Sequence, residues 1–321
     1  MRVIITGATS MLGGAVIEEC LAHGAEVVAL VRKNSPKIAR LPKSPRLTLV
    51  EAELTDLHSV QIDLPCDVFY HFAWDGTSKE TRDDPQTHLN NVQYTLDAVG
   101  LAHRLGCRKF IGAGSQAEYG IYSGKIYPDT RVEPILSYGI AKYAAGKLSR
   151  KICDRDGITH IWTRIFSVYG EHDSENTMIQ YALRQFRAGK PAQFSAATQK
   201  WNYLYEKDAG KIFYLLGEKD VPSGVYCVAS DDTRPLKEFI LEMKDVCGNG
   251  AKCEFAPPSE VPAVSLDPDI TSLVNAIGWR PQTSFREGIR KILVHMINDG
   301  GWWILTGNHA YRTDTEVRYA A

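Results

Sequence analysis

Short apolar runs alternate with longer amphipathic segments through the first half of the chain. The apolar runs have the length of buried strands, whereas Gln86–Leu105 and Ser137–Arg155 have the length and pattern of helices. Strands that alternate with helices predict an α/β fold with a doubly wound parallel sheet, covered by helices on both faces. The expected strands are Met1–Thr6, Glu26–Val31, Leu47–Val50, Val68–Phe72, Lys109–Ala113 and His160–Ile165.

Beyond residue 170 the alternation becomes less regular and prolines become frequent. We therefore expect residues 1–170 to form the first domain and residues 171–321 a smaller α/β domain. Tyr203–Leu216 and Gly224–Ala229 look like returns to the main sheet, so we expect the two domains to be interlaced. We assign no role to the tail from Gly300 onward.

Composition narrows the class of protein. The chain has 321 residues with a net charge of −1, which gives no reason to expect binding to nucleic acid or to an anionic membrane. Its seven cysteines form no Cys-x-x-Cys pair, so we expect no metal site and reduced thiols. A strand begins at once, no leader is recognisable and no apolar run is long enough to span a bilayer. We expect a cytoplasmic protein.

A glycine-rich turn follows the first expected strand. The segment Gly7-Ala8-Thr9-Ser10-Met11-Leu12-Gly13 leads into an expected helix, Ala15–His23, and then into the second strand. Strand, glycine turn, helix and strand are the context that a dinucleotide-binding fingerprint requires. The pyrophosphate of such a cofactor lies on the amides of the helix N-terminus. This turn therefore predicts a nicotinamide dinucleotide site.

The end of the second strand bears on which nicotinamide cofactor is bound. An acid at this position binds the ribose hydroxyls of NAD, whereas an arginine accommodates the 2′-phosphate of NADP. Here the position is Val31, followed by Arg32 and Lys33. Arginine can bind a phosphate through two parallel hydrogen bonds. We therefore favour NADP(H) over NAD(H), the alternative being that Arg32 and Lys33 form a solvated loop.

Three residues have the pattern of an acid–base site. Tyr138 and Lys142 lie four residues apart in an expected helix and so share one face. A free phenol has a pKa of about 10, and a neighbouring ammonium lowers it toward neutrality. Ser115, at the end of a separate strand, can hold a substrate oxygen while Tyr138 transfers its proton. We expect Ser115, Tyr138 and Lys142 to be catalytic.

These motifs belong to a longer ordered series along the chain. Together they resemble the extended short-chain dehydrogenase/reductases that act on nucleotide sugars, namely 4-epimerases, 4,6-dehydratases and 4-ketoreductases. The resemblance covers nearly the whole chain and implies a Rossmann sheet with a smaller substrate-binding domain. The series comprises Thr6-Gly7-x-x-Ser10-x-x-Gly13, Asn90–Thr95, Ser115 before Tyr119-Gly120, Tyr138-x-x-x-Lys142, Arg164–Gly170 and Gly278-Trp279-Arg280-Pro281.

The resemblance also implies roles for particular residues. Lys142 would bind the nicotinamide ribose as well as act on Tyr138, while His71 is expected to be a packed strand residue. Relatives commonly dimerise through a four-helix bundle, here formed by Gln86–Leu105 and Ser137–Arg155, so a homodimer is expected. The implied cofactor contacts are Gly7, Ser10, Met11, Leu12, Gly13, Arg32, Glu53, Leu54, Phe72, Ala73, Trp74, Asn91, Tyr138, Lys142 and Ile165.

Departures from the family pattern narrow the reaction. The Asp-Glu pair of 4,6-dehydratases is Gln116-Ala117 here, and neither side chain can act as a general acid, so a dehydratase is not expected. Both Tyr138 and Lys142 are present, whereas non-catalytic relatives usually lose one of them. A 4-ketoreductase of a nucleotide-linked sugar, similar to CDP-abequose and CDP-paratose synthases, is favoured. A 4-epimerase and a carbonyl reductase of a non-sugar substrate stay open.

The substrate site departs from the pattern as well. Ser167 replaces an asparagine that usually touches the sugar diphosphate, and Trp201 stands where the family often has an arginine. Lys200 is adjacent, although an ammonium does not reproduce the fork of a guanidinium. We expect substrate contacts from Gln116, Ser167 and Lys200.

Overall fold

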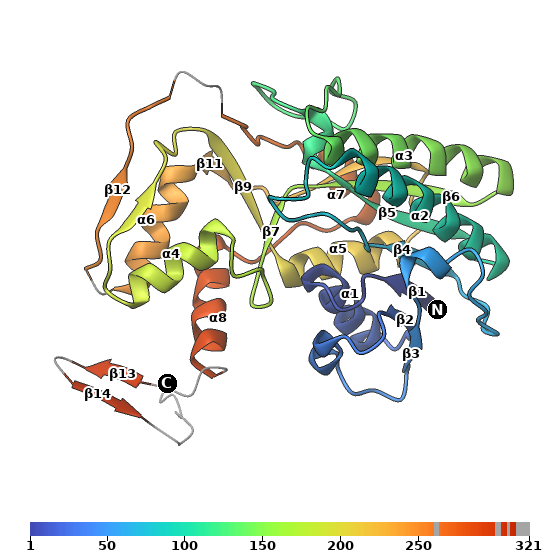
Figure 1. Ribbon diagram of the computed structural model, residues 1–321, viewed down its shortest axis with the longest axis horizontal. Helices are drawn as coiled ribbons and strands as arrows, with labels where there is room; N and C mark the ends of the chain where they lie inside the picture. The colour runs from blue at the N-terminus through green and yellow to red at the C-terminus, as the bar shows by residue number, and fades with distance from the viewer. Residues whose placement is uncertain (249, 260–262, 299–302, 307–308, 313–321) are drawn as a thin grey trace.

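The centre of the molecule is a seven-stranded parallel sheet. The computed structural model describes residues 1–248, 250–259, 263–298, 303–306 and 309–312. The strands follow the order β10-β6-β5-β4-β1-β2-β3, which is a doubly wound sheet (Figure 1). They are β1 (Arg2–Thr6), β2 (Glu26–Val31), β3 (Leu47–Glu51), β4 (Val68–His71), β5 (Lys109–Ser115), β6 (Thr159–Ile165) and β10 (Gly224–Val228).

Each face of the sheet is covered by a pair of helices. Side chains alternate across a strand, so Val3 and Ile5 pack on one face of the sheet and Ile4 packs on the other. Helices α1 and α5 pack together, as do α2 and α3. These helices are α1 (Met11–Ala22), α2 (Pro85–Arg104), α3 (Ser137–Asp156) and α5 (Glu206–Glu218), and short 3-10 turns occupy Pro36–Arg40, Leu54–Asp56 and Gln116–Tyr119.

A smaller lobe with its own apolar core lies beside the sheet (Figure 1). It contains a three-stranded sheet in the order β11-β9-β7 and a strand pair, β12-β8. Helix α7 (Thr271–Ile277) returns to pack against α5 and β10. The lobe is built from β7 (Ser167–Tyr169), α4 (Met178–Arg187), β8 (Ala192–Phe194), β9 (Lys200–Tyr205), β11 (Thr233–Pro235), α6 (Leu236–Cys247), β12 (Cys253–Phe255) and α8 (Phe285–Asn298).

The predicted doubly wound α/β fold is confirmed, with one correction among the segments expected to rejoin the sheet. Gly224–Val228 does join it as edge strand β10, paired with β6. Tyr203–Leu216 does not: its first residues end β9 in the small sheet, and the rest is helix α5. The apolar residues of that segment recur at helical spacing and pack against α1 rather than pairing as a strand. The domain boundary near residue 170 stays a prediction.

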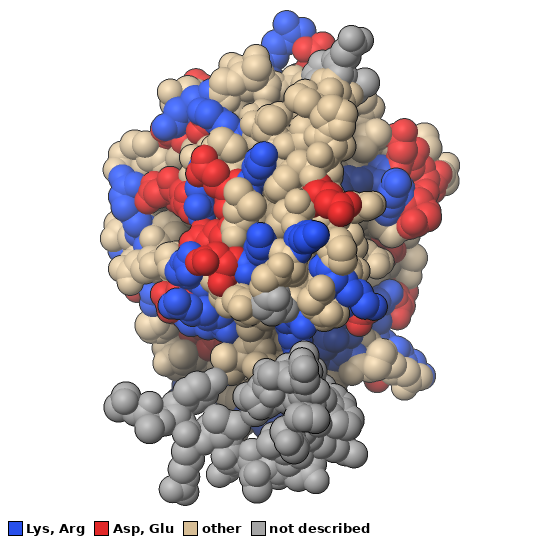
Figure 2. Space-filling view, turned by 90° about the vertical axis from the view of Figure 1, so that its left-hand side faces the viewer, with Lys and Arg blue, Asp and Glu red and all other residues tan. Residues whose placement is uncertain are grey.

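Part of the tail from Gly300 onward, including Trp302, lies outside the described residues. Within it, β13 (Trp303–Thr306) pairs with β14 (His309–Arg312) in antiparallel fashion. On the face shown in Figure 2, Lys and Arg side chains are interspersed with Asp and Glu, in keeping with the balanced charge of the chain. Among the helices in the described part, none is long and apolar enough to cross a membrane.

One buried indole determines how closely α3 approaches the sheet. Trp162 on β6 is almost fully buried and lies in a slot where three glycines face it. A Cβ on Gly112 or Gly114 would overlap the indole, and one on Gly146 of α3 would lie 2.6 Å from it. The missing side chains therefore let the helix that carries Tyr138 pack directly over β5 and β6.

We predict that Gly112→Ala destabilises the protein by about 1–3 kcal/mol, because the added methyl group overpacks the indole of Trp162. Urea unfolding at neutral pH measures the effect. Gly100→Ala in α2 is the matched control: its Cβ would meet only the end of Arg104, and alanine favours a helix by up to about 1 kcal/mol. Equal stability of the two variants would contradict the packing argument.

Candidate active site

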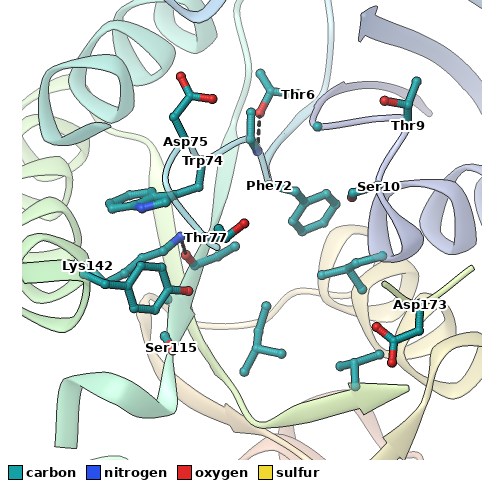
Figure 3. Close-up of a pocket in the computed structure, with 18 of the residues that line it drawn as sticks. Thr6, Thr9, Ser10, Phe72, Trp74, Asp75, Thr77, Ser115, Lys142 and Asp173 are labelled. Carbon is teal, nitrogen blue, oxygen red and sulfur yellow. Dashed lines mark hydrogen bonds between the residues drawn. The ribbon is translucent and has the colours of Figure 1, made fainter. Parts of the chain in front are cut away.

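A cleft opens at the carboxyl ends of the parallel strands. It has a volume of about 840 Å³ and runs from the glycine turn past the end of β5 to the small lobe. In Figure 3, Trp74, Ser115 and Lys142 line one side of it, while Ser10 and Asp173 lie on the other. Ligands of open parallel sheets bind at this edge, so the topology brings the residues expected to act together into one cavity.

The glycine turn is shaped for close backbone approach. Gly7 has a φ of +67°, and a Cβ there would lie 2.7 Å from the amide nitrogen of Ala73. Ser10, which replaces the family's middle glycine, is the N-cap of α1 and accepts a hydrogen bond from the Gly13 amide at 3.0 Å. The amides of Met11 and Leu12 come next in the first turn, where no intrahelical partner exists. These donors suit a pyrophosphate.

Two cations line the cleft beyond this turn. They are Arg32 and Lys37; all three neighbouring cations are exposed, but Lys33 does not line the cleft. Lys37 was missed from the sequence because it lies in the 3-10 turn that follows Asn34, a residue at φ +56° that reverses the chain. Glu53 and Leu54, at the start of the 3-10 turn that follows β3, also line this part of the cleft. These residues can contact the adenosine of a nicotinamide dinucleotide.

The three expected catalytic residues meet at the middle of the cleft. Ser115 ends β5, while Tyr138 and Lys142 lie on the first turns of α3, and all three line the cavity. The ammonium of Lys142 is buried, donates to the Ala113 carbonyl at 2.6 Å and lies 3.6 Å from the ring centroid of Trp74. Burial lowers the pKa of Lys142 to about 7, although the charge of Glu118 opposes this shift.

The environment of Tyr138 differs from the sequence expectation. Desolvation raises the pKa of the phenol; a hydrogen bond with Ser115 and the charge of Arg82 act in the opposite direction. Arg82 lies 4.7 Å from the ring centroid, whereas the Lys142 ammonium is 5.7 Å away and is held by Ala113. Arg82, which the sequence analysis did not single out, is therefore a cation that lowers the pKa of this phenol, and the effect expected of Lys142 stays a prediction.

A carboxylate that the sequence analysis did not single out supports Ser115. Glu118 is fully buried and accepts three hydrogen bonds. They come from the Ser115 amide at 2.9 Å, the Trp162 indole at 2.9 Å and the Arg164 guanidinium at 2.7 Å. Glutamate at the third position after a serine is a capping-box pattern, and this signal could have identified it.

The segment after β4 lines the nicotinamide end of the cleft. Phe72, Ala73 and Trp74 are on its wall. Asn91, an expected cofactor contact, does not line the cleft. Its buried side-chain amide accepts a hydrogen bond from the Asp75 amide and donates one to the Asp75 carbonyl, both at 2.9 Å, so it holds this segment in place. His71 is buried and hydrogen-bonded to Thr6 at 2.9 Å, in line with a packing role.

The substrate end of the cleft is aromatic and acidic. Gln116, Ile165 and Ser167 line it, but Lys200 does not, because its ammonium pairs with Asp267 at 2.7 Å. Trp201 and Tyr203 form part of the wall, and the indole nitrogen of Trp201 is buried without a hydrogen-bond partner in the described residues. Asp173 lies beside them, and burial raises the pKa of its carboxyl group. Of the three expected substrate contacts, two lie on the wall.

Comparison with known proteins decides the family. The model of the NAD dependent epimerase/dehydratase family matches residues 3–229, which is more than half of the chain. The chain belongs to this family. It is therefore an NAD(P)-dependent enzyme, and the resemblance inferred from the sequence is confirmed.

Individual relatives span several reactions. dTDP-4-dehydro-6-deoxyglucose reductase of Escherichia coli is 24% identical over 311 residues, covering 91% of this chain and 96% of the relative. CDP-abequose synthase of Salmonella muenchen is 24% identical over 305 residues, covering 91% and 97%. UDP-glucuronic acid 4-epimerase of Bacillus cereus, solved with NAD, has a TM-score of 0.80 at 20% identity, covering 92% and 96%. Reductases and epimerases both occur among the relatives of this enzyme.

Proposed function

We propose that this enzyme is an NADPH-preferring ketoreductase that reduces a nucleotide-linked 4-keto sugar. The observation that carries the proposal is the meeting of Ser115, Tyr138 and Lys142 in a cleft whose outer part carries Arg32 and Lys37. The two similar biosynthetic proteins, dTDP-4-dehydro-6-deoxyglucose reductase and CDP-abequose synthase, agree with a reductive reaction. Gln116 and Ala117 provide no general acid for elimination of water.

The chain's own residues account for binding and proton transfer. Bound NADPH would supply the hydride. Met11 and Leu12 would hold its pyrophosphate through their amides, and Arg32 with Lys37 its 2′-phosphate. Asn91 would act indirectly, by fixing the segment that carries Trp74.

At the reacting carbon, Ser115 would hydrogen-bond the ketone oxygen while Tyr138 donates its proton to the developing alkoxide. A raised phenol pKa suits this direction, because it keeps Tyr138 protonated until the alkoxide forms. Lys142, with a pKa of about 7, is poised to return a proton to the phenolate.

We also propose that the enzyme is a homodimer built on α2 and α3. Leu89 on α2 is 62% exposed, and Ile140 and Leu148 on α3 are 51% and 47% exposed, so these adjacent helices carry apolar side chains on the surface. A C2 pairing of the two helices with their copies would bury them.

Tyr138→Phe is expected to lower kcat by about 10²–10⁴-fold, because the variant removes the proton donor of the transition state. The assay follows NADPH oxidation with a panel of nucleotide-linked 4-keto-6-deoxyhexoses. Tyr143→Phe, on the same helix but outside the cleft wall, is the control and should keep its kcat. Near wild-type turnover by Tyr138→Phe would reject the catalytic assignment.

Replacement of Arg32 and Lys37 by alanine is expected to weaken NADPH binding about tenfold or more while NADH binding changes little, because only NADPH carries the 2′-phosphate. Lys33→Ala is the matched control and should leave both affinities unchanged. Titration by nucleotide fluorescence measures the affinities.

Mass spectrometry of the cofactor released from freshly purified protein is the second test. Stoichiometric retained NAD⁺ would favour the 4-epimerase over the ketoreductase.

Leu89→Glu combined with Ile140→Glu is expected to convert the dimer to a monomer, because charges replace exposed apolar contacts at the proposed interface. Light scattering coupled to gel filtration gives the mass. Leu241→Glu, at an exposed position of α6 outside this face, is the control and should stay dimeric. A monomeric wild-type protein at micromolar concentration would overturn the dimer proposal.

A further inference from the structure

The backbone of Arg82 is hydrogen-bonded to the start of α3. Its carbonyl oxygen accepts hydrogen bonds from the Tyr138 amide at 3.2 Å and from the His88 ring at 3.0 Å. The neighbouring Asp83 accepts from the Ser137 amide at 2.8 Å and from the Ser137 hydroxyl at 2.9 Å. This segment between β4 and α2 is thus fastened to the residues around Tyr138, and Arg82 has a defined position.

The guanidinium of Arg82 has no acidic partner among the described residues. It stacks at 4.7 Å from the ring centroid of Tyr138, is half-buried and lines the cleft. In the described part of the chain it makes no ion pair and no side-chain hydrogen bond. The nearest acids in sequence are already engaged, since Asp83 binds Ser137 and Asp84 caps α2 through Thr87. The donors of Arg82 are therefore available to a ligand.

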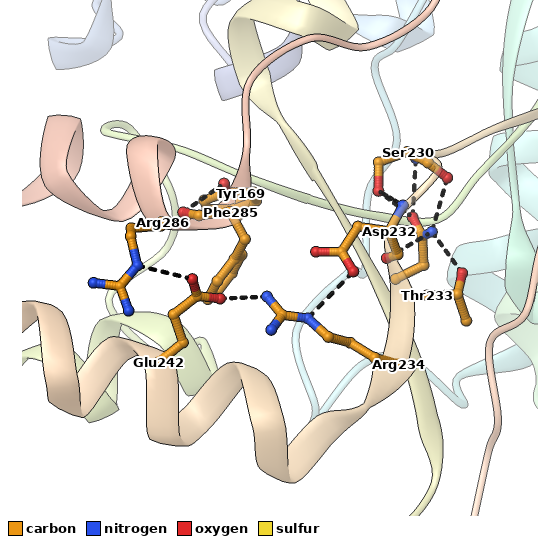
Figure 4. A network of polar contacts seen from close by, with 9 residues as sticks. Tyr169, Ser230, Asp232, Thr233, Arg234, Glu242, Phe285 and Arg286 are labelled. Carbon is orange, nitrogen blue, oxygen red and sulfur yellow. Dashed lines mark hydrogen bonds and ion pairs between the residues drawn. The ribbon is translucent and has the colours of Figure 1, made fainter.

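The other cations near the cleft have partners or lie elsewhere. Lys142 is bound to Ala113, and Arg32 with Lys37 lies at the adenosine end. Arg234, cross-strand from Trp201, is ion-paired with Asp232 and Glu242 in the network of Figure 4 and stacks on Phe239.

Lys200 is paired with Asp267 and lies off the cleft wall. Among the described residues that line the substrate end beside Trp201 and Tyr203, the titratable side chain of Asp173 is acidic, and no lysine or arginine is present. Among the described residues of the cleft, Arg82 is therefore the cation that can bind an anionic group of the substrate.

We propose that Arg82 is a specificity-determining residue that binds an anionic group of the substrate beside the carbon that reacts at Tyr138. This inference rests on the proposed function, because Tyr138 marks the reacting carbon. A planar guanidinium fork binds a carboxylate or a phosphate through two parallel hydrogen bonds, which an ammonium cannot do. The anion is either a carboxylate on the sugar ring or the diphosphate of the sugar nucleotide, drawn toward Arg82 because the far wall lacks a cation.

Binding of two probes, UDP-glucuronic acid and UDP-glucose, distinguishes these sources. Both carry the diphosphate, and only the first carries a ring carboxylate. Calorimetric titration in the presence of NADPH compares the wild type with Arg82→Gln and Arg82→Lys. We expect Arg82→Gln to weaken at least one probe about tenfold or more, and Arg82→Lys to recover only part of that loss, because the lost bonds are charge-assisted.

A loss confined to UDP-glucuronic acid identifies the carboxylate as the anion, and an equal loss for both probes identifies the diphosphate. Unchanged affinity for both probes, or no binding of either by the wild type, overturns the proposal. Arg131→Gln, on an exposed loop and outside the cleft wall, is the matched control. The thermal midpoint and the NADPH affinity of Arg82→Gln should match the wild type, which separates anion binding from misfolding.

The binding assay needs no hydride transfer, so it separates two kinds of failure. If the panel of 4-keto sugars is not reduced but Arg82→Gln still loses probe affinity, the proposed reaction fails and the anion site stands. If the sugars are reduced and Arg82→Gln binds both probes normally, the reaction stands and the anion site fails.

Discussion

The buried carboxylate of Glu118 connects the parts of this active site. Its two oxygens accept the Ser115 amide, the Trp162 indole and the Arg164 guanidinium, so β5, β6 and the turn after β5 meet at one group. A charge without solvent is tolerated only when it is paired and hydrogen-bonded, and here both conditions are met. The same charge also favours the ammonium of Lys142. Removal of this carboxylate would leave Arg164 as an uncompensated buried charge and release Ser115.

Charged side chains of both signs line the cleft, including Glu53 in the same part as the outer cations. Arg32 and Lys37 lie at the outer end, Arg82 and Lys142 flank Tyr138, and Asp173 lies at the far end. Desolvation raises the pKa of the Tyr138 phenol and lowers that of the Lys142 ammonium to about 7, which makes the ammonium the stronger acid of the two. Transfer of a proton from the Lys142 ammonium to the Tyr138 phenolate is therefore favourable, and the reverse transfer is not.

Departures from the family pattern have physical reasons in the structure. Ser10 keeps the turn closed by capping α1, so loss of the middle glycine does not open the pyrophosphate site. Trp201 takes the place of an arginine and turns the substrate wall aromatic, while Lys200 pairs with Asp267 on the outside. The arginine contact to the diphosphate expected at this wall is missing from its described residues, whereas Arg82 lines the cleft beside Tyr138.

The sequence alone determined the doubly wound sheet, the glycine turn, the two long helices and the convergence of Ser115, Tyr138 and Lys142. These follow from local periodicity, and a parallel sheet necessarily brings its strand ends together at one edge. The tertiary structure alone decided that Tyr203–Leu216 is mostly helix α5, that Lys37 rather than Lys33 lines the cleft, and that Arg82 lies over the ring of Tyr138. Those outcomes depend on how loops and side chains from distant segments pair, and no local pattern encodes a contact across the fold.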